Sequence, residues 1–62
     1  MVKNKVKERR EEMGMTLSDL SEESGVPIST ISEIEQGAEP KILTAMSIAF
    51  SLGVTVEELW II

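Results

Sequence analysis

Residues 16–37, TLSDLSEESGVPISTISEIEQG, decide the fold because they encode two short helices joined by a glycine turn. Thr16 is a favourable N-cap, and Asp19, three residues later, completes a capping-box pattern. Gly25 supplies a left-handed turn, and Gly37 ends the second helix where glycine turns at low cost. This order of signals predicts a helix-turn-helix.

The periodicity of the same stretch predicts which residues are buried. Leu20 should point inward among small neighbours in the first of the two helices. Pro27 restarts the chain as a helix, and Ile31 and Ile34 recur at helical spacing on one face of it. We therefore expect both helices to pack through these apolar positions.

Three further helices are expected around this unit, and no strand alternation or repeat is present. One spans 2–13, with Val6 and Met13 inward; one spans 40–52; and a short one begins at residue 55. The expected core stripe of the 40–52 helix is Ile42, Ala45, Ile48, Ala49 and Leu52. The chain should thus form one all-α bundle over residues 1–62.

A longer pattern of residues runs through nearly the whole chain. Its members are Val6, Arg10, Gly14, Met15, Thr16, Leu20, Gly25, Val26, Ser29, Thr30, Ile31, Ser32, Ile34, Glu35, Gln36, Gly37, Pro40, Thr44, Ile48, Ala49, Leu52, Gly53, Val54, Val56, Glu57, Glu58 and Leu59. In this pattern the sequence resembles the phage repressor and Cro-like helix-turn-helix regulators, the XRE family. The resemblance implies a compact five-helix bundle of the lambda-repressor-like DNA-binding type, with the second and third helices as the helix-turn-helix.

Composition excludes several classes of function. The 62 residues contain no cysteine and no histidine, which removes disulfides, zinc-finger ligands and the usual general base. We therefore expect neither an enzyme nor a metal or cofactor site. No apolar run approaches the roughly 20 residues of a membrane span, and the lysine-rich start lacks an apolar signal region, so a cytoplasmic location without membrane contact is expected.

The net charge of −5 argues against strong non-specific attraction to nucleic acid. Five of the 6 cations lie in the first ten residues, beside a single acid, Glu8. After Arg10 the chain has one cation, Lys41, and ten of the 11 acids. Phosphate-facing charge must therefore come mainly from the first helix, although a solvated lysine-rich face is the alternative reading of most of these residues.

The resemblance implies that the start of the second helix and the exposed face of the third read bases in the major groove. By position these residues are Leu17, Ile28, Ser29, Ser32 and Glu33. The two apolar residues could press against thymine methyl groups, the serines could bond to base edges, and the glutamate could accept from a cytosine amino group. The alternative is that they are ordinary surface residues.

Contacts to phosphate are expected from the amides that start these two helices. The side chains of Thr16, Gln36, Arg10 and Lys41 should assist them. Glu39, where relatives often carry a basic residue, would repel a phosphate, so non-specific binding should be weak. The family pattern also pairs an arginine of the first helix with a glutamate near the end of the third, which implies a structural ion pair between Arg10 and Glu35.

The 40–52 helix has a second apolar face, formed by Leu43, Met46 and Phe50 at spacings of three and seven residues. Members of the resembling family are commonly polar at positions like those of Leu43 and Phe50. The chain also ends in Trp60, Ile61 and Ile62. Trp60 could belong to the core, but together these residues indicate a surface covered by a second subunit.

Two functions from different classes remain. The first is a sequence-specific transcriptional repressor that binds a palindromic operator in double-stranded DNA as a homodimer. The second is an acidic protein-interaction module on the same fold, such as an antirepressor or an antitoxin-like partner, with little DNA binding. The helix-turn-helix spacing favours the first function, and the acidic balance favours the second.

Overall fold

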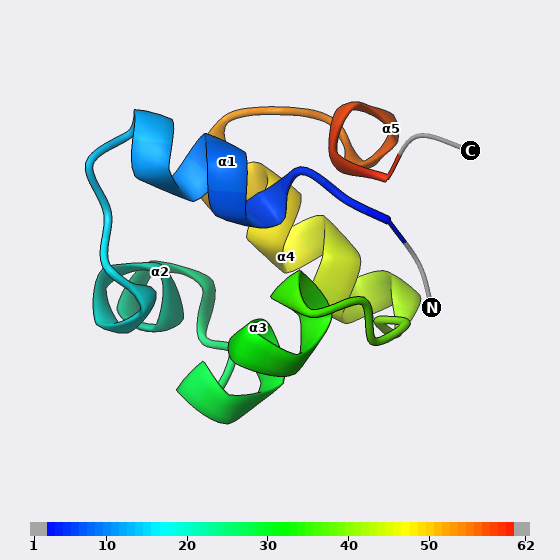
Figure 1. Ribbon diagram of the computed structural model, residues 1–62, viewed down its shortest axis with the longest axis horizontal. Helices are drawn as coiled ribbons and strands as arrows, with labels where there is room; N and C mark the ends of the chain where they lie inside the picture. Colours follow the sequence, from blue (N-terminus) through cyan, green and yellow to red (C-terminus); the bar gives the residue numbers. More distant parts are fainter. Residues whose placement is uncertain (1–2, 61–62) are drawn as a thin grey trace.

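A computed structural model describes residues 3–60, and within them all regular structure is helical (Figure 1). The helices are α1 (Val6–Glu12), α2 (Leu17–Ser24), α3 (Ile28–Glu35), α4 (Ile42–Leu52) and α5 (Val56–Leu59). α4 packs against α1, α2 and α5, and α3 packs against α2 and α1. None of these helices is long and apolar enough to cross a membrane. The predicted all-α bundle of five helices, with α2 and α3 as the helix-turn-helix, is confirmed.

The hydrophobic core contains residues from every helix, as the apolar periodicity predicted. Leu20 of α2 and Ile31 of α3 have no exposed surface, and Ile34 is almost fully buried. The buried apolar residues are Val6, Leu20, Val26, Ile31, Ile34, Ala45, Ile48, Ala49, Leu52 and Leu59. A core this small makes each of these side chains important for stability.

Two residues expected in the core are exposed instead. Met13 retains 44% of its accessible surface because α1 ends at Glu12 and the chain turns away at Gly14, whose φ is 71°. Ile42 retains 66%. Ile42 is the first residue of α4. A helical side chain leans toward the turn that precedes it, so the side chain of a first residue points beyond the helix and has no preceding turn to pack over.

The first helix begins later than its sequence pattern predicted. Residues 3–5 are not helical, since the Asn4 side chain accepts a hydrogen bond from the Val6 N–H (3.1 Å), and the Lys5 N–H donates to the Leu59 carbonyl (2.8 Å). An asparagine that bonds to nearby backbone competes with helix formation in this way. The contact with Leu59 also joins the start of α1 to α5. Val2, the predicted first residue of this helix, lies outside the described residues.

Candidate DNA interface

The start of α2 is closed by a complete capping box. The Thr16 side chain accepts a hydrogen bond from the Asp19 N–H (3.1 Å), and the Asp19 carboxylate accepts one from the Thr16 N–H (3.0 Å). This arrangement satisfies amides that would otherwise lack partners at a helix start. The remaining N–H groups of the first turn are therefore held in a fixed orientation at the N-terminal end of α2, where the helix dipole favours a bound anion.

The turn between α2 and α3 is fixed by one glycine and two serines. Gly25 has a φ of 76°, the left-handed conformation predicted from the sequence. The Ser21 hydroxyl donates to the Val26 carbonyl (2.6 Å), and the Ser24 hydroxyl donates to the Leu20 carbonyl (2.7 Å). From the sequence, Ser21 and Ser24 were expected only to be the small neighbours of Leu20. Serine in the last turn of a helix often bonds back to the backbone, so their position could have indicated this role.

The outer face of α3 carries the residues that were expected to read bases. Ile28 keeps 46% of its surface in solvent, Ser29 and Glu33 are exposed, and Ser32 is half-buried. The inner face of the same helix is buried in the core, so these four side chains are presented outward. Leu17, at the start of α2, differs from them because it is partly buried against the core. Leu17 can therefore offer only part of its side chain to a ligand.

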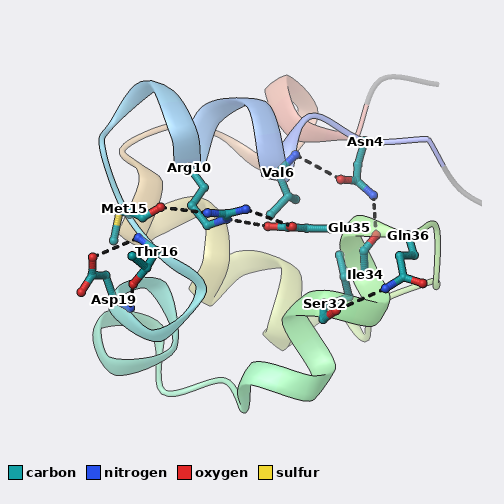
Figure 2. A network of polar contacts seen from close by, with 10 residues as sticks. All are labelled: Asn4, Val6, Arg10, Met15, Thr16, Asp19, Ser32, Ile34, Glu35 and Gln36. Carbon is teal, nitrogen blue, oxygen red and sulfur yellow. Dashed lines mark hydrogen bonds and ion pairs between the residues drawn. The ribbon is translucent and has the colours of Figure 1, made fainter.

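A buried ion pair holds α3 against α1 (Figure 2). The Arg10 Nε donates to Glu35 Oε2 at 2.8 Å, and its Nη2 donates to Oε1 at 3.3 Å. The Arg10 Nη1 also donates to the Met15 carbonyl (2.8 Å), in the segment that leads into α2. The side chains of Arg10 and Glu35 are only 10% and 8% exposed. One guanidinium thus links α1, the entry to α2, and the end of α3.

The same geometry bears on the two roles expected of Arg10. Hydrogen bonding to Glu35 raises the pKa of Arg10, although burial opposes this effect, so the guanidinium stays charged. It is buried, and its bonds are directed at protein atoms rather than outward. The structure therefore favours the structural role of Arg10 over phosphate contact. The burial of Arg10 separates the structural role from phosphate contact, and this burial cannot be read from the sequence.

A second link between α1 and α3 was not anticipated. The Asn4 Nδ2 donates to the Ile34 carbonyl (2.8 Å) at the end of α3, while its Oδ1 accepts from Val6 at the start of α1 (Figure 2). Asparagine shortly before a helix is a known capping signal, so its bond to Val6 could have been predicted. Its bond to a residue 30 positions away could not.

Few cations are free to face a phosphate. Lys3, Lys5 and Lys7 are exposed on or before α1, but the Arg9 Nε donates to the Leu52 carbonyl at the end of α4 (3.1 Å). Near α3, exposed Lys41 lies two residues from exposed Glu39 in the sequence. The exposed Gln36 side chain donates to the Ser32 hydroxyl (3.3 Å), on the outer side of α3.

Among the described residues, no group of three or more potential metal ligands is close enough to hold an ion.

The second apolar face of α4 is open to solvent. Leu43, Met46 and Phe50 are 73%, 53% and 87% exposed. Trp60 is instead partly buried against the core, as the alternative reading allowed. The other two predicted contact residues of the tail, Ile61 and Ile62, lie outside the described residues.

Comparison with known proteins agrees with this geometry. A protein-family model described as helix-turn-helix matches residues 6–59. The chain belongs to the helix-turn-helix family of XRE-type regulators. A chain in a solved structure of a SinR protein/SinI protein complex is also similar, with 34% sequence identity and a TM-score of 0.80.

That match covers 86% of the present helix-turn-helix chain but only 53% of the other chain, so the similarity concerns about half of that protein. Comparison with curated proteins gives no significant match. The family membership assigns the chain to a class of DNA-binding regulators. Its base contacts and its oligomeric state require separate arguments.

Proposed function

We propose that this helix-turn-helix protein is a sequence-specific transcriptional repressor that binds double-stranded DNA as a homodimer. The observation that carries the proposal is the outer face of α3, where Ile28, Ser29 and Glu33 are exposed on a helix anchored from behind by the Arg10–Glu35 pair. An anchored helix with a free outer face can enter a major groove without rearrangement. Family membership supports the same use of α3.

The residue types on this face suit particular base edges. Ser29 and Ser32 can hydrogen-bond to bases, Glu33 can accept from the cytosine N4 amino group, and Ile28 and Leu17 can contact thymine methyl groups. Thr16, Gln36 and Lys41 would contribute phosphate contacts, together with the amides that start α2 and α3. Because few cations are available, we expect the affinity to depend only weakly on salt.

A homodimer imposes symmetry on the operator. Two copies of α3 must enter successive major grooves on one side of the duplex, so the half-sites should lie about 10–10.5 base pairs apart, centre to centre. The two-fold symmetry of the protein then requires a near-palindrome.

A protein-interaction module is the second candidate. It is favoured by the net charge of −5 and by the exposed apolar face of α4. The similar chain comes from a structure described as a complex of two proteins, which is compatible with a protein partner for a chain of this type. On this reading the outer face of α3 would have lost most of its affinity for DNA.

Selection of bound sites from random duplex DNA, at low and at moderate salt, separates the two candidates. Recovery of a near-palindrome with the stated half-site spacing would support the repressor. Binding that disappears at moderate salt without any sequence preference would favour the interaction module.

We expect Glu33→Ala to relax the preference at one base pair in each half-site. The exposed carboxylate is the only acidic group among the expected base contacts, and one good base contact supplies about 1–3 kcal/mol of discrimination. The measurement is the selected-site profile of the variant against that of the wild type. Lys41→Ala is the control, since loss of a phosphate contact should weaken all sequences alike. An unchanged profile for Glu33→Ala would show that this residue reads no base.

A further inference from the structure

The exposed apolar face of α4 has the form of a ridge. Leu43, Met46 and Phe50 follow one another at spacings of three and four residues, so they project from one side of the helix. A phenylalanine side chain buries about 150–250 Å² when it is fully covered, and Phe50 leaves 87% of its surface in water. Exposed apolar surface concentrated in this way marks an interaction site.

A groove of about 520 Å³ runs beside this ridge, between α4 and the end of α2. The ridge residues Leu43, Met46 and Phe50 form one wall of it, and four more residues line the rest: Glu23 and Ser24 from α2, and Ser47 and Ser51 from α4. Three of these four residues are serines, whose small side chains leave space for larger ones. Among the described residues that line the groove, only Glu23 carries a charge.

We propose that a second copy of this chain docks here, with the α4 ridge of each copy inserted into the α2–α4 groove of the other. The inference rests on the proposed homodimer and states how the two copies meet. A two-fold interface must be self-complementary, because the same patch faces itself. The ridge and the groove lie side by side on one patch, so each copy offers both the projection and the space that receives it.

The area that a stable dimer requires shows how far the contact must extend, and the charge of the groove is compatible with this occupant. A stable interface buries about 800 Å² on each partner, or roughly a fifth of the 4200 Å² surface of the chain. The ridge alone is smaller than this, so the contact must extend over the groove wall formed by α2. Glu23 is the only charged residue among the described residues that line the groove, so little like-charge repulsion arises within the groove itself.

This arrangement leaves the DNA-reading face free. None of Ile28, Ser29, Ser32 and Glu33 lines the α2–α4 groove. Dimerisation through the groove and base contact through α3 are therefore separable by mutation, which the following experiment uses.

Sedimentation equilibrium at tens of micromolar tests the proposal with matched variants. We expect a wild-type dimer, and we expect Phe50→Lys to raise the dimer dissociation constant at least about thirtyfold, the effect of losing a central interface residue. Ile28→Lys introduces the same charge at another exposed apolar residue and should leave the constant unchanged. Circular-dichroism melts confirm that both variants are folded.

Site-specific cross-linking provides a second measurement, because the chain contains no cysteine. Ser47 lines the groove at the middle of α4, so in the proposed dimer it should lie near the two-fold axis. Ser47→Cys should form a disulfide-linked dimer on mild oxidation, whereas Lys7→Cys, exposed on α1, should remain monomeric at the same concentration.

The outcomes separate this inference from the proposed function. A wild-type dimer that Phe50→Lys does not weaken would place the interface elsewhere and overturn the inference, while the homodimer itself would stand. A monomeric wild type would overturn both the inference and the homodimer, and it would indicate that the ridge binds another protein. Binding of Phe50→Lys to a single operator half-site tests DNA recognition independently, since its α3 face is unchanged.

Discussion

Glu35→Ala should lower the free energy of unfolding by about 3–5 kcal/mol, because it leaves a buried arginine without its counter-charge. In the wild type the Arg10 guanidinium contacts both carboxylate oxygens of Glu35, at 2.8 and 3.3 Å, and both side chains are about nine-tenths buried. Arg10 cannot escape by losing its proton, since even its ordinary pKa lies far above neutral pH. The stranded charge must therefore remain buried at a cost or draw water into the bundle.

Urea unfolding followed by circular dichroism measures this loss, and Glu39→Ala is the matched control. Glu39 is exposed and lies four residues after Glu35, so its replacement should change stability by about 0.5 kcal/mol or less. The double variant Arg10→Met, Glu35→Leu should recover much of the stability, because apolar side chains of similar size can replace a buried pair. Equal stability of Glu35→Ala and Glu39→Ala would show that the pair contributes nothing.

Ile31→Ala should destabilise the protein by about 2–5 kcal/mol, whereas Ile28→Ala should cost about 1 kcal/mol or less. Both isoleucines are in α3, three residues apart. Ile31 is fully buried, so its truncation leaves a cavity, but Ile28 is 46% exposed and leaves none. Thermal unfolding of the two variants gives the comparison directly.

The order of the two variants should be reversed when affinity for DNA is measured well below both melting temperatures. There the effect of Ile28→Ala should be larger than that of Ile31→Ala. Folded Ile31→Ala keeps the outer face of α3, so its selected-site profile should match the wild type. Ile28→Ala removes apolar surface expected to meet thymine methyl groups, so it should bind those sites less tightly. Substituting uracil for each contacted thymine removes only the methyl group. Unchanged affinity for every uracil-substituted operator would show that Ile28 does not contact thymine.

The sequence by itself determined the helix-turn-helix, because its signals act over short distances. The capping box of Thr16 and Asp19, the left-handed turn at Gly25, and the inward spacing of Ile31 and Ile34 each depend on residues within a few positions of one another. Local hydrogen bonds and helical periodicity set them, so their pattern could be read without a structure. The exposed ridge of α4 was also readable, since it is an apolar face left over after the core stripe is assigned.

The tertiary structure alone decided which side chains at the helix ends are covered and which groups without a local signal meet. Met13 and Ile42 have the residue types of core positions, yet both lie at helix ends and keep 44% and 66% of their surface exposed. The hydrogen bond from Arg10 to Glu35, which the family resemblance implied but no local pattern did, and the bond from Asn4 to the Ile34 carbonyl join residues 25 and 30 positions apart. Such contacts depend on how the helices pack against one another in space. The residues close to either partner in the sequence carry no signal of that packing.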